Sequence, residues 1–202
     1  MKYFRILFVV VCCVFVEGGL DNALYPPASR LLAPYFKEKF NLRRSYGIEG
    51  PHISSVVSFG HLLPTGLRSG IGSGGMRHTA SWMLEQYAVN ETKNFCSVPS
   101  VTVFSLLRGG PIDIHIIDPE SGDLTTKTLG PKNRDGFVAQ IPAGHYSAFK
   151  VRKTKRYPFR FALFSLVSLP EMMEGDESCP RRAELLSKFP LRKRLITRFT
   201  NE

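Results

Sequence analysis

Short apolar segments alternate with turn-forming residues through the middle of the chain. Glycine, proline and aspartate separate the segments, and each segment is long enough for only one strand. Short strands at such regular spacing predict an all-β sandwich or jelly roll. The predicted strands cover residues 56–63, 78–89, 101–107, 112–117, 124–128, 137–141, 146–152 and 159–168.

Both ends of this β region carry patterns that are typical of helices. Apolar side chains recur at i, i+4 spacing over residues 29–41, where Ser29 is placed to cap the first turn. Beyond residue 170 the chain passes through an acidic stretch into a basic segment, in which residues 183–190 carry apolar anchors. We therefore expect a short helix on each side of the strands.

The first residues have the pattern of a secretory signal peptide. Lys2 and Arg5 precede an unbroken apolar run at residues 6–16, and the small residues Gly18 and Gly19 follow. The run is about 11 residues long, whereas a membrane-spanning anchor needs roughly 20. We expect cleavage at these glycines, which would leave a protein that is secreted or stays in the lumen of the secretory pathway.

An oxidising compartment changes how the cysteines and one asparagine are interpreted. Cys12 and Cys13 would leave with the signal peptide, whereas Cys96 and Cys179 would remain as an even pair. The sequence leaves open whether these two form a disulfide or stay as separate buried thiols, because it does not supply their Cα separation. Asn90 opens an Asn-Glu-Thr sequon, which predicts N-glycosylation.

The formal net charge of +10 is high for a chain of 202 residues. Such a charge favours acidic partners, such as anionic glycans, nucleic acid or a membrane surface, although a basic surface also arises without any partner. The tail cluster at residues 192–194 predicts either a contact with an anionic surface or a loose, solvated terminus. A second basic cluster precedes it in the chain, at residues 152–156. The cations of the two clusters are Arg152, Lys153, Lys155 and Arg156, and Arg192, Lys193 and Arg194.

Two segments carry a resemblance to a known family. Gly136-x5-Pro142-x-Gly144 is similar to the second motif of the cupins, and the spacing that ends at Gly109 is that of the first motif. The order of further segments, with Gly109-Gly110-Pro111-Ile112 followed by Leu129-Gly130, resembles the cupin-5 branch, a domain of unknown function. The resemblance covers most of the chain that follows the signal peptide.

This resemblance implies a fold class and a division of the chain. The fold would be a cupin-like double-stranded β-helix, that is, a jelly-roll barrel with short N- and C-terminal helices. Residues 1–19 would be the signal peptide, 30–170 the barrel with its N-terminal helix, and 171–202 a basic helical tail that packs on the barrel. Many cupins pair as dimers, so a homodimer is one expected assembly.

The resemblance also locates the positions where metal-binding cupins carry two histidines, a glutamate and a third histidine. Here these positions hold Cys96, Val98, Thr102 and Ser147. Imidazoles and a carboxylate suit a divalent transition metal, and this set does not, so we expect no metal and no cofactor. Val98, Thr102 and Ser147 would instead project into the barrel, as the lining of an apolar pocket or as packed core. Asp113 and His115 share a strand face, but a rebuilt metal site would need a further ligand.

These observations favour a non-catalytic protein that binds a small ligand, such as a carbohydrate, or a protein partner. Two alternatives stay open. The first is a metal-independent sugar isomerase or epimerase in which His145 and Tyr146, beside the barrel mouth, exchange protons with the substrate. The second is a polyanion-binding protein that acts through the two basic clusters.

Overall fold

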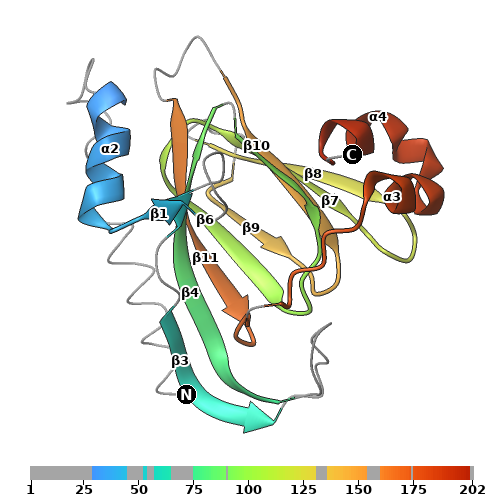
Figure 1. Cartoon of the computed structure of the whole chain (residues 1–202), viewed down its shortest axis with the longest axis horizontal. Helices are drawn as coiled ribbons and strands as arrows, with labels where there is room; N and C mark the ends of the chain where they lie inside the picture. Colours follow the sequence, from blue (N-terminus) through green and yellow to red (C-terminus); the bar gives the residue numbers. More distant parts are fainter. Residues whose placement is uncertain are drawn as a thin grey trace.

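A computed structural model describes residues 29–44, 52–53, 57–64, 75–89, 91–130, 136–153, 160–173 and 175–200. Its strands form two antiparallel sheets (Figure 1). The predicted jelly-roll class is confirmed. No helix in the described part of the chain is both long and apolar enough to span a membrane.

The larger sheet has the strand order β1-β2-β4-β11-β6-β9, and β3 pairs with the other part of β4. The smaller sheet has the order β5-β10-β7-β8. The larger sheet contains β1 (Arg43–Arg44), β2 (His52–Ile53), β3 (Val57–Pro64), β4 (Met76–Ala88), β6 (Val101–Gly109), β9 (Val138–Ile141) and β11 (Phe161–Leu169), and the smaller one β5 (Thr92–Cys96), β7 (Ile112–Ile117), β8 (Leu124–Leu129) and β10 (Tyr146–Val151).

Strand β5 was missing from the sequence prediction. Its residues are Thr92-Lys93-Asn94-Phe95-Cys96, which begin with three polar side chains and show no apolar run. The strand forms because it pairs with β10 at the edge of the smaller sheet. Tertiary pairing therefore overrides a weak local preference for the strand state.

The core lies between the two sheets and is rich in aromatic rings. Alternation along each strand directs Phe104 of β6, Phe149 of β10 and Phe164 of β11 to the same interior, where Tyr87 of β4 joins them. The Tyr87 and Phe149 ring centroids are 5.0 Å apart, and those of Tyr87 and Phe164 are 5.6 Å apart. Edge-to-face and stacked pairs of this kind add to the free energy gained by burial alone.

Glycine is required where β6 ends. Gly109 has a φ of 114°, and a Cβ atom at this position would overlap the carbonyl oxygen of Phe161 in β11. This close approach allows β6 and β11 to stay paired up to the turn that leads into β7. The glycine that the sequence marked as the end of the first motif thus has a packing role.

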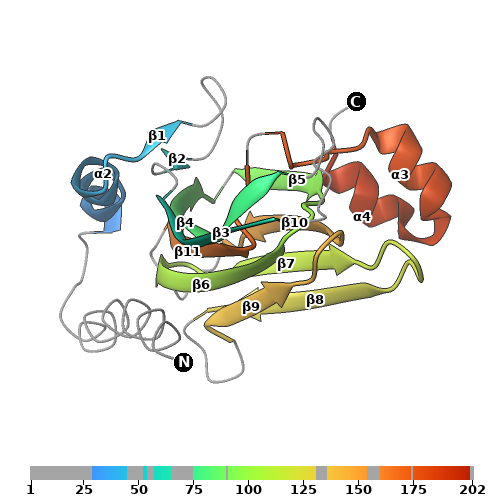
Figure 2. The same ribbon diagram turned by 90° about the horizontal axis from the view of Figure 1, so that it is seen from below.

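Helices lie at opposite ends of the molecule (Figures 1 and 2). At one end, α2 (Ser29–Lys39) places Phe36 against Phe161, with 6.1 Å between the ring centroids. At the other end, α3 (Arg182–Lys188), the 3-10 helix η2 (Pro190–Arg192) and α4 (Lys193–Arg198) cover the outer face of the smaller sheet. Their apolar contacts join one buried cluster, formed by Phe95, Ile117, Ala148, Leu185, Phe189, Ile196 and Phe199.

The aromatic core gives a direct test of this architecture. We expect Phe149→Ala to lower the free energy of unfolding by about 3–5 kcal/mol, because the cavity left between the sheets cannot collapse fully. Urea denaturation measures the change. Phe137→Ala is the matched control, because that ring is 51% exposed, and its effect should stay within about 0.5 kcal/mol. Equal losses for the two variants would contradict the assignment of Phe149 to the core.

Candidate functional site

The four positions that correspond to the cupin metal ligands gather around one turn, at residues 142–144. Cys96 on β5 is the register partner of Ser147 on β10. Thr102 is buried on the interior face of β6, and its register partner is Ile141, which leads into the turn. The carbonyl oxygen of Val98 accepts a hydrogen bond from the Gly144 N–H at 2.8 Å. The structure therefore brings these positions together.

Their side chains do not form a metal centre. Cys96 forms a disulfide with Cys179, so its sulfur is not a free thiolate, and this structure resolves the pairing that the sequence left open. The Thr102 hydroxyl faces the carbonyl oxygen of Ser100 at 3.5 Å. The Val98 side chain has no atom that could bind a metal ion. Within the described ranges, the three potential ligand side chains that come close together are Cys96, Glu177 and Cys179, and two of them are in the disulfide.

A strap, defined here as residues 171–173 and 175–179, crosses from the end of β11 towards β5 and then leads to α3 (Figure 1). Ser178 of the strap exchanges backbone hydrogen bonds with Ser97, with N–O distances of 2.8 and 2.9 Å. Met172 packs against the apolar core between the sheets. The strap thus covers the barrel on the side of β4 and β5.

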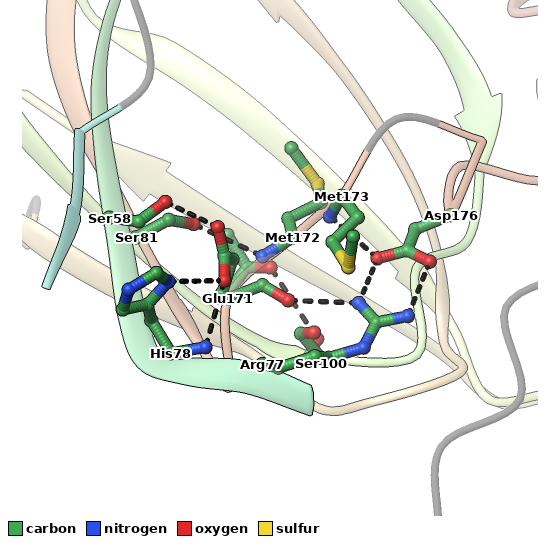
Figure 3. A network of polar contacts seen from close by, with 10 residues as sticks. Ser58, Arg77, His78, Ser81, Ser100, Glu171, Met172, Met173 and Asp176 are labelled. Carbon is green, nitrogen blue, oxygen red and sulfur yellow. Dashed lines mark hydrogen bonds and ion pairs between the residues drawn. The ribbon is translucent and has the colours of Figure 1, made fainter. Parts of the chain in front are cut away.

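Two acidic groups hold the strap to β4 (Figure 3). The buried Asp176 carboxylate pairs with Arg77, whose Nη2 donates to Oδ1 at 2.8 Å, while the Arg77 Nη1 donates to the Glu171 carbonyl oxygen at 2.9 Å. The Glu171 carboxylate accepts hydrogen bonds from the Ser58 hydroxyl and from the His78 backbone N–H, and it lies 2.9 Å from the His78 Nδ1. These contacts bind the strap to both β3 and β4.

The Asp176 carboxyl stays ionised although it is buried. Burial acts to raise its pKa, but hydrogen bonds from Arg77 and from the Met173 N–H outweigh that effect and hold the pKa below its usual range. On the other side of the pair, the hydrogen bond to Asp176 raises the pKa of Arg77. The charged form of the pair is therefore the stable one in the folded protein.

A second buried acid, Glu85, lies on the inner face of β4 between Met83 and Tyr87. Glu85 is only 5% exposed, and its Oε2 atom has no hydrogen-bond partner in the described part of the structure. Burial raises the pKa of Glu85, and the nearby Glu177 adds to this, while Lys93 and a hydrogen bond with Tyr87 act in the opposite direction. Burial also raises the pKa of the Tyr87 hydroxyl.

An ion pair lies close to this buried acid. The Nζ of Lys93 on β5 is 2.6 Å from the Glu177 Oε1 of the strap, and it lies 5.8 Å from the Phe149 ring centroid. Both side chains of the pair are partly exposed, whereas Glu85 is buried. Glu85, Tyr87, Lys93 and Glu177 therefore form a polar group at the side of the barrel, which we call the β4 polar group.

Sequence reasoning missed this group. The interpretation of residues 78–89 followed Trp82, Leu84 and Gln86, which share the other face of β4. The sequence did carry one signal. Glu85 lies two residues after Met83 and two before Tyr87, and a strand directs these three side chains to one face. Lys93 and Glu177 are 84 residues apart by number in the chain, and only the fold brings them together.

His145 and Tyr146 have different contact partners in the structure. The His145 Nε2 lies 3.4 Å from the Asp118 Oδ2, in the loop between β7 and β8. The Tyr146 ring packs against the C-terminal helices, with its centroid 5.9 Å from that of Phe189. An isomerase that uses this pair would need both side chains at one substrate, and this hypothesis stays a prediction.

Other candidate residues are engaged in local contacts or lie outside the described ranges. Asp113 accepts hydrogen bonds from Arg152 and Thr128, and the His115 Nδ1 lies 3.0 Å from the Thr126 hydroxyl. The Arg152 charge is therefore partly neutralised by Asp113. The sequon residue Asn90 and the cations Lys155 and Arg156 fall outside the described residues.

The folded strands, the turn at residues 142–144 and the barrel interior define a protein of the cupin class. Residues 35–173 match the model of the family described as "Cupin superfamily (DUF985)", and the chain belongs to this family. No curated protein matches the chain.

Two solved structures share the fold over most of this chain. A hypothetical protein from Leishmania major is 16% identical, with a TM-score of 0.72, over 84% of this chain and 99% of its own. A protein from Shewanella oneidensis is 19% identical, with a TM-score of 0.65, over 84% of this chain and 97% of its own. At such identities these similarities support the fold alone.

The buried ion pair of the strap predicts a pH-dependent stability. Because the folded-state pKa of Asp176 is depressed, its contribution is present above the unfolded-state value of about 3.9 and is lost as the pH falls through the folded-state pKa. We expect Asp176→Asn to lower the free energy of unfolding by about 3–5 kcal/mol at neutral pH, because Arg77 is left buried without its partner. The difference in the free energy of unfolding between Asp176→Asn and the wild type should become smaller below about pH 4.

Urea denaturation of both proteins across this pH range measures the effect. Asp113→Asn is the matched control, because its ion pair with Arg152 is partly exposed and should contribute at most about 1 kcal/mol. A deficit in Asp176→Asn that stayed constant down to acid pH would show that the carboxylate charge does not hold the strap.

Proposed function

We propose that this chain is a secreted, non-catalytic cupin that binds a small neutral ligand rich in hydroxyl groups, such as a carbohydrate, through the β4 polar group. The observation that carries the proposal is the Glu85 Oε2 atom, which is buried inside the barrel without a hydrogen-bond partner among the described residues. An unsatisfied buried polar atom costs about 1–3 kcal/mol, so its presence calls for a compensating role. A ligand hydroxyl that pairs with Oε2 would supply the missing bond.

The chemistry of Glu85 favours a neutral ligand over a charged one. Burial raises its pKa, which favours the protonated acid, and a protonated carboxyl both donates and accepts a hydrogen bond. Sugar hydroxyls also donate and accept, so the two groups are complementary.

The environment of the site also explains how a ligand would reach Glu85. The Lys93–Glu177 pair is partly exposed and lies beside the buried acid, so the ligand would enter by displacing or bridging this pair. A partly exposed ion pair contributes little to stability, and its opening therefore costs little. The residues at the family's ligand positions support binding without metal-dependent catalysis, because Cys96 is in a disulfide and Val98 has an aliphatic side chain.

The leader and the disulfide support secretion. The N-terminal pattern is that of a signal peptide, and the Cys96–Cys179 disulfide is typical of an oxidising compartment. Expression in a eukaryotic secreting host, followed by N-terminal sequencing of protein from the medium, tests this part. A new N-terminus near Leu20, together with loss of the Asn90 glycan in an Asn90→Gln variant, is the expected result. Retention of the intact leader inside the cell would contradict it.

Titration calorimetry against neutral sugars tests the binding proposal. Glucose, galactose, mannose and their disaccharides form the probe panel. For any sugar that binds, we expect Glu85→Leu to weaken the affinity at least about fivefold, because the ligand loses a hydrogen bond worth roughly 1–3 kcal/mol. The same variant should unfold within about 1 kcal/mol of the wild type, since the substitution also removes an unsatisfied buried atom.

Gln86→Leu is the matched control for this experiment. Gln86 is the neighbouring residue, it is also buried with an unpartnered Oε1, and it lies on the opposite face of β4. We expect it to leave sugar binding unchanged. Unaltered affinity in Glu85→Leu, or binding of none of the sugars, would contradict the proposed ligand site.

A further inference from the structure

The C-terminal helices have one face fixed by the fold and another face exposed to solvent. Leu185, Phe189, Ile196 and Phe199 are buried against the smaller sheet. The segment from residue 181 to residue 200 carries seven cationic residues and a single acidic one, Glu184. The helices lie at one end of the molecule (Figure 2), and five of the seven cationic residues are exposed to solvent.

The turn between α3 and α4 presents an unusual apolar residue within this charge. Leu191 in η2 is 92% exposed, so no part of the described chain covers its side chain. The turn is held in place, because the Arg192 Nε donates a hydrogen bond to the Gly122 carbonyl oxygen at 3.1 Å and the Phe189 side chain is buried. Leu191 therefore projects from a fixed turn and not from a frayed end.

The cations next to Leu191 are free to meet a partner. Lys193 and Arg194 are exposed, and neither forms an ion pair with any residue that the structure describes. Lys188 and Arg198 are also exposed and lie over the faces of Phe189 and Phe199, respectively. The segment itself carries one acidic residue, Glu184, and the loop that contacts Arg192 carries Asp118, Glu120 and Asp123. The local charge at the turn is thus positive.

We propose that this surface, formed by Leu191 with Lys188, Lys193, Arg194 and Arg198, docks on an anionic lipid bilayer. The cations would contact lipid phosphates, and Leu191 would enter the boundary between the headgroups and the acyl chains. The exposed leucine distinguishes this partner from a sulfated glycan or a nucleic acid. Both of these would attract the cations, but neither offers an apolar phase in which Leu191 is buried. The proposal is independent of ligand binding in the barrel.

Vesicle flotation with the full-length chain tests this proposal. The probes are vesicles of phosphatidylcholine alone and of phosphatidylcholine mixed with phosphatidylglycerol. We expect binding to the anionic vesicles that weakens as salt is raised, and much weaker binding to phosphatidylcholine. The variants and the wild type are compared on the same full-length background, so that the apolar run at residues 6–16 is identical in all of them.

Two variants separate the charge from the apolar contact. The double variant Lys193→Glu with Arg194→Glu should lower the affinity for anionic vesicles by roughly tenfold or more, since each cation near an anionic surface contributes about 1 kcal/mol. Leu191→Ser should lower it roughly tenfold through the lost burial of the side chain. Heparin binding should fall in the charge variant and stay unchanged in Leu191→Ser.

The control variant is Lys153→Glu with Arg160→Glu, which changes the net charge by the same amount at exposed positions in the segment between β10 and β11. It should bind vesicles as the wild type does. Equal binding of Leu191→Ser and the wild type would overturn the proposal. An equal loss in the control would also overturn it, because net charge and not this surface would then carry the binding. Binding to heparin without binding to vesicles would assign the surface to a polyanion instead.

Discussion

The buried ion pair between Arg77 and Asp176 ties the strap to β4. Each of these charges would cost several kcal/mol to bury alone, so the two segments that carry them are held to one relative position. One segment is the inner face of β4 and the other is the strap. Fixing the strap in turn places Met172 against the core, Glu177 beside Lys93 and Cys179 at Cys96.

The pKa values of the two buried carboxyl groups, Asp176 and Glu85, are shifted in opposite directions. Asp176 has a guanidinium partner and a backbone donor, which keep its pKa low, whereas the pKa of Glu85 is raised because burial dominates. The first carboxyl therefore stabilises the fold and the second carries an unused oxygen. Glu85 lies on the inner face of β4, whereas Cys96, Thr102 and Ser147, which correspond to metal ligands of the family, lie on β5, β6 and β10.

The C-terminal helices show how one segment can satisfy the core and still present a surface. Packing on the smaller sheet uses their apolar residues and fixes the turn at η2. The charges that packing cannot bury face solvent, and Leu191 stays among them. Such a placement costs the folded protein little, since a single exposed leucine is tolerated on a surface, but it becomes favourable when a partner covers it.

Local pattern was sufficient for most strands of the jelly roll, for α2, for the first C-terminal helix, α3, and for the motif glycines, because side-chain alternation and turn residues depend only on neighbours in the chain. The positions that correspond to the cupin metal ligands, Cys96, Val98, Thr102 and Ser147, came from the resemblance to the family and not from local pattern. Local pattern did not predict strand β5, because that strand forms through its pairing with β10. The disulfide, the pairing of Arg77 with Asp176, and the position of Lys93 and Glu177 beside Glu85 were decided only by the tertiary structure. Each joins residues far apart in the sequence, and no local periodicity encodes the distance between them.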